Sequence, residues 1–259
     1  MHGRQPLADT SGTSRNWFAQ GGQAYARFRP AYPPELARYL AALSPDTALA
    51  ADVGCGNGQL TTQLAAHFEQ VIGLDPSAGQ LAHAIPHERV RYACASAEQM
   101  PLRDGCASLV TAAQAAHWFD LPRFHAEVRR VARDGAAVAL VSYGVLWLDG
   151  LAGERFMRFY RDEIGPYWPP ERRLVDSGYE DLPFPFEEQP TPALHIRQDW
   201  TLDELLGYIA TWSAVRHARE AGQEGLLHRF ADDLKSLWGG DASLRRELRW
   251  PIRMRVGIV

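Results

Sequence analysis

The sequence predicts an α/β protein whose core is a mostly parallel sheet. The first observation is an apolar run at Leu49–Asp52, which a glycine-rich turn joins to a helix-like segment at Gln59–Phe68. The second is that further short apolar runs alternate with helical patterns, as in repeated strand–helix–strand units. These additional strands are expected at Val71–Asp75, Val90–Cys94, Ser108–Ala112 and Ala136–Val141. The last run is almost entirely apolar, as expected for a central strand that is buried on both faces.

Apolar residues at helical spacing predict the helices of the chain. The expected helices are Pro34–Leu43, Gln59–Phe68, Pro76–Ala84, Pro122–Arg133, Leu151–Ile164, Leu202–Val215 and Gly225–Leu237. A sixth strand is expected at His195–Arg197. The terminal stretch Ile252–Val259 alternates apolar residues with arginines, which predicts a half-exposed final strand.

The turn after the first strand reads Asp-Val-Gly-Cys-Gly-Asn-Gly over residues 52–58. Glycine lacks a Cβ and tolerates positive φ, so this backbone can approach a ligand closely. A second acidic residue, Asp75, ends the next strand. In a strand–helix–strand unit this carboxylate lies beside the loop, where it can accept hydrogen bonds from a ribose. Asp75 can instead cap a neighbouring turn, and we expect Asp52 to orient the loop.

These two stretches, residues 52–58 and Gly73-Leu74-Asp75-Pro76-Ser77, resemble the motifs of the class I S-adenosylmethionine-dependent methyltransferases. The resemblance implies a Rossmann-like, seven-stranded, mostly parallel sheet with an antiparallel last strand. It also implies S-adenosylmethionine as the cofactor and methyl transfer to a small-molecule acceptor by in-line displacement. The cofactor-binding residues expected from strands and loops are Asp52, Gly54, Cys55, Gly56, Gly58, Asp75, Pro76, Ser96, Ala97 and Gln114. Where this chain has Ser96, family members commonly carry an acidic residue.

Two alternatives remain open at this point. One is an NAD-dependent oxidoreductase, but the dinucleotide fingerprint has two residues before its third glycine, whereas only Asn57 separates Gly56 from Gly58. The other is a cofactor-binding regulator without catalytic activity.

An aromatic segment, Trp17–Tyr32, precedes the first predicted helix. Its pattern of Tyr25, Arg29-Pro30 and Tyr32-Pro33 resembles the N-terminal lid of methyltransferases in the group of trans-aconitate and ubiquinone-pathway enzymes. That resemblance implies that Tyr25 and Arg29 lie against the cofactor. A packing segment anchored by aromatic residues is the alternative.

Residues that follow the predicted strand ends are candidates for the acceptor site, because ligands of open α/β sheets bind beyond the carboxyl ends of the strands. His117 is the candidate general base, with a hydrogen-bonding role as the alternative. The expected acceptor-pocket residues are Trp118, Tyr143, Trp147, Tyr208 and Trp212. No metal site is expected from the histidines.

Composition limits the class of protein. The 259 residues carry a net charge of −4 with no basic block, which disfavours nucleic-acid binding. The three cysteines have neither metal nor disulfide spacing, no run is long enough to span a membrane, and a cytoplasmic location is expected. We expect a disordered tail at residues 1–16 and a single domain at 17–259, with cap insertions around 143–190 and 200–240. The oligomeric state stays open.

Overall fold

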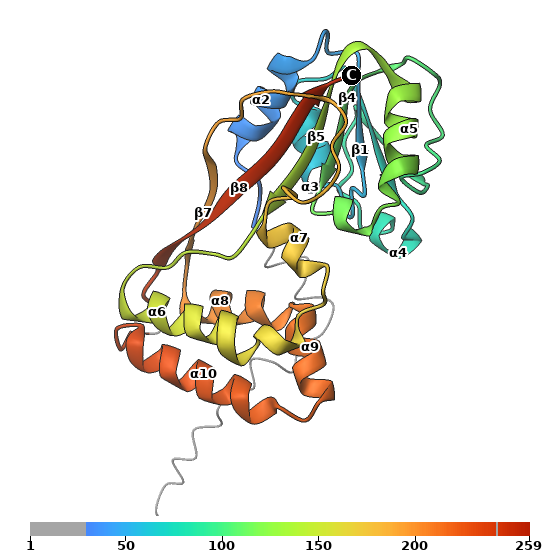
Figure 1. The fold of residues 1–259 in the computed structure, drawn as a ribbon. Coiled ribbons are helices and arrows are strands. Elements are labelled where there is room, and N and C mark those ends of the chain that lie inside the picture. Colours follow the sequence, from blue (N-terminus) through green and yellow to red (C-terminus); the bar gives the residue numbers. More distant parts are fainter. Residues whose placement is uncertain (1–29, 242) are drawn as a thin grey trace, which may run out of the picture.

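A computed structural model describes residues 30–241 and 243–259 of the chain. Its centre is a sheet with the strand order β3-β2-β1-β4-β5-β8-β6, and β7 also pairs with β8 (Figure 1). The strands are β1 Leu49–Val53, β2 Gln70–Asp75, β3 Val90–Cys94, β4 Ala107–Ala113, β5 Ala132–Tyr143, β6 Glu187–Glu188, β7 Leu194–Trp200 and β8 Arg246–Ile258.

Among the strands of the described residues, β8 alone runs against the direction of the others. β1 to β5 pair in parallel, β8 is antiparallel to β5, and both β6 and β7 are antiparallel to β8. β6 pairs with residues 257–258 and β7 with residues 246–252, so the two strands share one position along β8. The sheet therefore has seven positions, and the predicted mostly parallel sheet with an antiparallel last strand is confirmed.

Helices cover both faces of the sheet. On one face, α2 Pro34–Leu43 and α3 Gln59–Leu64 bury their leucines against β1, β2 and β4. On the other, α5 Leu121–Val131 and α7 Arg172–Asp176 pack on β4 and β5. The short α4 Ala78–Leu81 follows β2. Apolar side chains of the central strands alternate between the two clusters, as the pleat of a strand buried on both faces requires.

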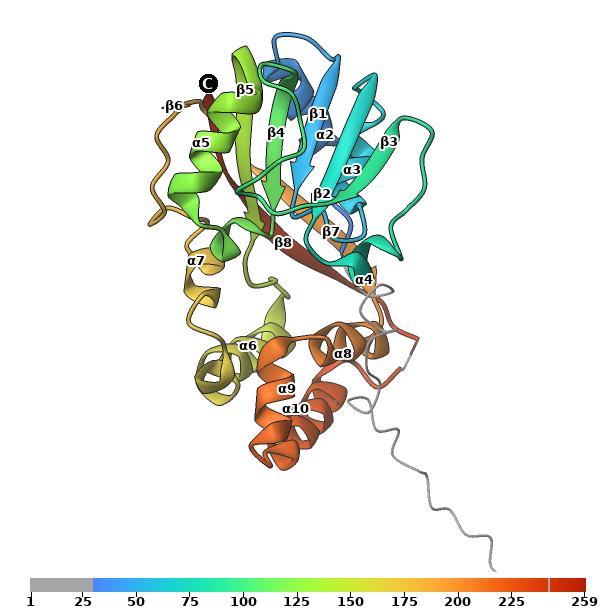
Figure 2. The same cartoon turned by 90° about the vertical axis from the view of Figure 1, so that its right-hand side faces the viewer.

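A layer of helices lies beyond the ends of β5 and β7 (Figures 1 and 2). This helical cap consists of α6 Gly150–Arg158, α8 Leu202–Ala210, α9 Ser213–Glu220 and α10 Glu224–Leu237. A π-helical turn Phe159–Glu163 and a 3-10 turn Gly165–Tyr167 follow α6. β5 leads directly towards α6 and β7 directly into α8, so the carboxyl ends of these strands face the cap.

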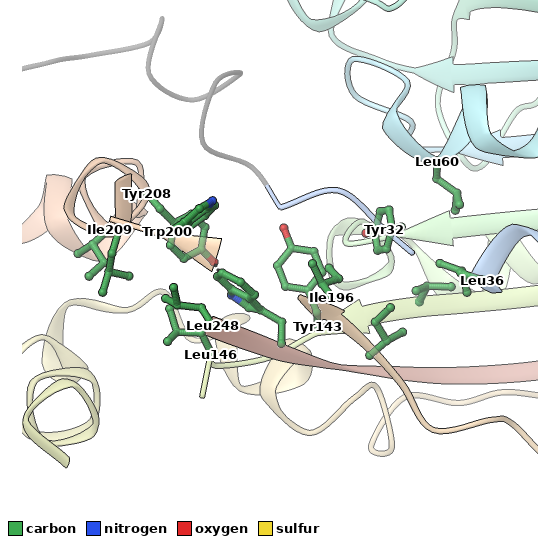
Figure 3. Packing of buried hydrophobic residues seen from close by; sticks show 14 of the residues in the cluster. Tyr32, Leu36, Leu60, Tyr143, Leu146, Ile196, Trp200, Tyr208, Ile209 and Leu248 are labelled. Atoms are coloured by element: carbon green, nitrogen blue, oxygen red, sulfur yellow. Dashed lines mark hydrogen bonds between the residues drawn. The ribbon is translucent and has the colours of Figure 1, made fainter. Parts of the chain in front are cut away.

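The sheet and the cap share one apolar cluster. Figure 3 shows Tyr143, at the end of β5, between Tyr32 and Leu36 on the sheet side and Trp200 and Tyr208 on the cap side. All five side chains are buried. The cap is thus fixed to the strand ends by the same hydrophobic burial that holds the sheet and its helices together.

Some predicted helices differ in their extent, and the one expected at Gln59–Phe68 simply ends earlier, at Leu64. The single helix expected at Leu202–Val215 is two helices, because the chain turns at Thr211 and is extended at Trp212 (φ −70°, ψ 140°). The Thr211 hydroxyl donates to the carbonyl of Tyr208 at 2.6 Å, which closes the end of α8. Among the residues described, no helix has the length and apolar character needed to cross a bilayer.

Candidate active site

The glycine loop follows β1 as the sequence predicts. Gly54, Gly56 and Gly58 have φ of +69°, +57° and +87°, a region that strongly favours glycine. A Cβ at Gly54 would lie 2.4 Å from the Cβ of Ala115, and one at Gly58 would lie 2.0 Å from the Tyr92 hydroxyl. A Cβ at Gly56 would meet nothing within 4 Å. Two of the glycines are therefore required by packing, whereas the third leaves an open approach to the backbone.

Asp75 holds this loop in place. Its Oδ2 accepts a hydrogen bond from the Gly56 amide at 2.9 Å, and its Oδ1 accepts one from Ser77 at 2.8 Å. Pro76 separates Asp75 from Ser77 in the chain, and the Ser77 side chain caps the start of α4. The capping role considered from the sequence is thus present. Because a carboxylate has about four acceptor positions, these two bonds leave capacity for further donors.

Asp52 lies buried beneath the loop. Its carboxylate accepts hydrogen bonds from the hydroxyls of Thr61 at 2.6 Å and Thr111 at 2.8 Å, which tie β1 to α3 and β4. Burial raises the pKa of Asp52 to about 6, although both hydrogen bonds act in the opposite direction. The group is consequently ionised above about pH 6, which leaves a buried negative charge under the glycine loop. Burial also raises the pKa of the Cys55 thiol, so Cys55 is not a nucleophile.

The end of β4 contains a non-glycine residue in the left-handed region, Gln114, with φ +56°. Its backbone N–H donates to the carbonyl of Val141, and its side-chain Nε2 donates to the carbonyl of Tyr143, both at 2.8 Å. These bonds fix the ends of β4 and β5 relative to each other. After β3, Ser96 is exposed and Ala97 is buried.

His117 follows β4 in a short 3-10 turn, Ala116–Trp118. Its Nδ1 lies 3.0 Å from the hydroxyl of Tyr179, a fully buried residue with φ +65°. Burial, and secondarily Arg172, lower the pKa of His117 to about 4. The imidazole is therefore neutral near pH 7. Trp118 is 66% exposed, directly beside it.

The residues expected around the acceptor are only partly brought together. Tyr208 and Trp212 contact each other with ring centroids 5.6 Å apart, and Tyr143 belongs to the same apolar cluster. Trp147 is 54% exposed and forms an isolated bridge with Arg249 instead. Tyr25 and Arg29 lie outside the described residues, as does the tail at residues 1–16.

Several side chains that sequence reasoning missed join Trp212. Trp168 lies 5.2 Å and Tyr160 lies 5.8 Å from its ring, centroid to centroid. Arg172 lies over Trp168, with its Cζ 4.7 Å from the ring centroid. We call these four residues the Arg172 cluster. Its one sequence signal was the i,i+4 spacing of Arg172 and Asp176, which form an ion pair on α7.

The strand order, the single antiparallel strand and the glycine loop held by an acidic residue together define a class I methyltransferase. Comparison with known proteins agrees. A family model for a methyltransferase domain matches residues 51–140. A candidate methyltransferase from Dictyostelium discoideum is 32% identical over 244 residues, which covers 92% of each chain. The chain belongs to the class I S-adenosylmethionine-dependent methyltransferases.

Two further relatives show how far the similarity extends. The solved structure of a candidate type II methyltransferase from Anaeromyxobacter dehalogenans shares 44% identity, covers 89% of this chain and 98% of its own, and has a TM-score of 0.84. A malonyl-acyl-carrier-protein O-methyltransferase from Pectobacterium atrosepticum is 31% identical, but over only 48% of this chain and 51% of its own. The first similarity includes the cap, because it covers nearly the whole chain.

Proposed function

We propose that this protein transfers the methyl group of S-adenosylmethionine to a small-molecule acceptor by in-line displacement. Membership of the methyltransferase family supports the reaction class. The observation that carries the choice of cofactor is the loop at Gly56, where positive φ and open space meet beside the Asp75 carboxylate. The spacing of the glycines, with only Asn57 between Gly56 and Gly58, disfavours a nicotinamide cofactor.

The residues present fit such a cofactor. Bound, it supplies a methyl group that is already activated as a sulfonium. In the proposal, Asp75 uses its remaining acceptor capacity for the ribose hydroxyls, and the open backbone at Gly56 lies against the cofactor. The buried charge of Asp52 favours a positively charged ligand above it. Gln114 and Ala97 are the proposed contacts on the β3 and β4 side of the loop.

The acceptor in the proposal lies between the strand ends and the helical cap. Placing two reactants in alignment is worth up to about 7–11 kcal/mol, so positioning can supply most of the catalysis. His117 is neutral at pH 7 and hydrogen-bonded to Tyr179. A pKa near 4 makes it a weak base, which favours its role as a hydrogen-bonding group that orients the acceptor.

Two glycine variants test the cofactor assignment. Gly56→Ala and Gly105→Ala both place a Cβ at a φ near +60° with nothing within 4 Å, so both should cost about 1–2 kcal/mol of stability. Gly105 precedes the amino end of β4, whereas the glycine loop follows the carboxyl end of the neighbouring parallel strand β1. Only Gly56→Ala should weaken S-adenosylhomocysteine binding, by about tenfold or more, measured by calorimetry.

Ligand-induced stabilisation gives the second measurement. S-adenosylhomocysteine at 100-fold over its Kd should add about 2.7 kcal/mol to the unfolding free energy, which raises Tm by several degrees. NAD should leave Tm unchanged. A Tm increase with NAD and none with S-adenosylhomocysteine would refute the proposed function.

A further inference from the structure

We propose that Arg172 and Trp168 form a subsite that holds a carboxylate of the acceptor. The inference rests on the proposed function, because it specifies the chemical class of the molecule to be methylated. Hydrogen-bond donors without acceptors among the described residues, their place in the fold and the charge around them support it.

Arg172 uses only one edge of its guanidinium within the protein. Its Nε donates to Asp176 Oδ1 at 3.0 Å and to the Tyr160 hydroxyl at 3.1 Å. Across residues 30–241 and 243–259, Nη1 and Nη2 of Arg172 donate no hydrogen bond, and 23% of the side-chain surface is exposed. The free edge of a guanidinium presents two parallel N–H groups, which match the two oxygens of a carboxylate.

Trp168, which packs against Arg172, supplies a further donor. Its indole Nε1 is buried and has no hydrogen-bond partner among the described residues. Burying such a donor without an acceptor costs free energy, and native proteins rarely leave one unpaired. The ring itself lies against the Arg172 guanidinium, at 4.7 Å from Cζ to ring centroid. The unpaired indole N–H and the free edge of the Arg172 guanidinium therefore belong to two side chains in direct contact.

The position of these groups fits the acceptor side of the proposed reaction. Figures 1 and 2 both show α7, which begins at Arg172, between the sheet and the helical cap. The charge of Arg172 contributes to the lowered pKa of His117, after the larger effect of burial, so it lies within electrostatic range of the β4 end. Trp212 of the Arg172 cluster comes from the cap, and Tyr208 of α8 packs against it.

The local charge favours one carboxylate over a phosphate group. Arg172 supplies one positive charge, whereas Asp176 and the adjacent Glu171 carry two negative charges. A phosphate ester with nearly two negative charges would be repelled by these carboxylates more strongly than a group of charge −1. The two coplanar oxygens of a carboxylate also match the free edge of the guanidinium, and the aromatic rings can pack against its carbon skeleton.

The test compares carboxylic acids with their amides. The enzyme saturated with S-adenosylhomocysteine is titrated with benzoate, benzamide, hexanoate and hexanamide, and binding is followed by ligand-observed NMR and tryptophan fluorescence. Phenyl phosphate is included as the phosphate arm. The variants are Arg172→Gln and Trp168→Phe, with Arg173→Gln as the matched control. Arg173 is the exposed neighbour on α7, where its side chain forms no ion pair with the described residues, so its loss changes net charge equally.

In the wild type, we expect at least one acid to bind about tenfold or more tightly than its amide. Arg172→Gln should abolish this preference, Trp168→Phe should reduce it, and Arg173→Gln should preserve it. All three variants should bind S-adenosylhomocysteine as the wild type does, which shows that they are folded. Equal binding of acids and amides, equal losses in Arg172→Gln and Arg173→Gln, or tighter binding of phenyl phosphate would overturn the carboxylate subsite. Failure of the wild type to bind S-adenosylhomocysteine would instead refute the proposed function.

Discussion

The buried charge of Asp52 predicts that Asp52→Asn stabilises the ligand-free protein near neutral pH. Burial raises the pKa of this carboxyl from its ordinary value of 3.8 to about 6. The folded state therefore binds this proton more tightly than the unfolded state. The stability contributed by the group is highest below about pH 4 and is lost as the pH rises to about 6. At about 1.4 kcal/mol per pH unit, the charged group costs about 3 kcal/mol at neutral pH.

Asparagine removes the charge but changes the hydrogen bonds. The hydroxyls of Thr61 and Thr111 both donate to Asp52, whereas an asparagine offers one acceptor oxygen and one donor nitrogen. One hydroxyl must turn to accept, which offsets about 1 kcal/mol of the gain. We therefore expect Asp52→Asn to raise the unfolding free energy by about 1–3 kcal/mol at about pH 7.5.

Urea unfolding of the ligand-free protein, followed by circular dichroism and fluorescence at about pH 7.5 and about pH 4.5, measures the effect. The difference between variant and wild type should shrink on acidification. Asp46→Asn is the control of opposite sign, because hydrogen bonds from Ser108 and Ala48, and the Arg133 ion pair, lower the pKa of Asp46. That variant should be less stable than the wild type at neutral pH, and its deficit should fade as the pH falls.

A different result would refute the reasoning about the buried carboxylate. If Asp52→Asn lowered stability at about pH 7.5 by an amount that did not change with pH, the two threonine hydrogen bonds would outweigh the cost of burying the charge. The same variant should also bind S-adenosylmethionine more weakly, because its sulfonium is positively charged and the lost negative charge lies under the glycine loop.

Three further predictions concern the loop and the β4 end. Gly58→Ala should destabilise the fold by more than about 2 kcal/mol. Adding Tyr92→Phe should not restore stability, because the new Cβ at residue 58 would also lie 2.8 Å from Cζ of the residue 92 ring; urea unfolding of the single and double variants measures the effect. Asp75→Ala should weaken the binding free energy of S-adenosylhomocysteine, measured by calorimetry, by about 1–3 kcal/mol. Unchanged affinity would mean that Asp75 has only the capping role. His117→Ala should lower turnover with unchanged S-adenosylhomocysteine affinity. In the wild type, kcat/KM should show no inflection from this histidine near pH 6.5, since its pKa lies near 4; an inflection there that His117→Ala removes would contradict this.

The sequence by itself determined the glycine loop and the strands on either side of it. Positive φ at Gly54, Gly56 and Gly58 is a property of the chain at those residues, so the motif predicts its own conformation. The central parallel strands could be predicted as well, because a strand buried on both faces consists mostly of apolar residues. The position of Asp75 beside the loop followed from these two local facts, and the structure places its carboxylate on the Gly56 amide.

Only the tertiary structure decided which side chains surround the proposed acceptor site. No proline or glycine marks the break between α8 and α9 at Thr211 and Trp212, so the helical spacing of apolar residues predicted one helix that continues to Val215. Trp168 contacts Trp212 although the two residues are more than 40 positions apart in the sequence, and Tyr179 contacts His117 at a separation of 62. Contacts over such separations depend on how the cap packs against the strand ends, and local periodicity carries no information about that packing. The sequence likewise could not show that Trp147, an aromatic residue expected in the acceptor pocket, is exposed and forms a backbone bridge with Arg249.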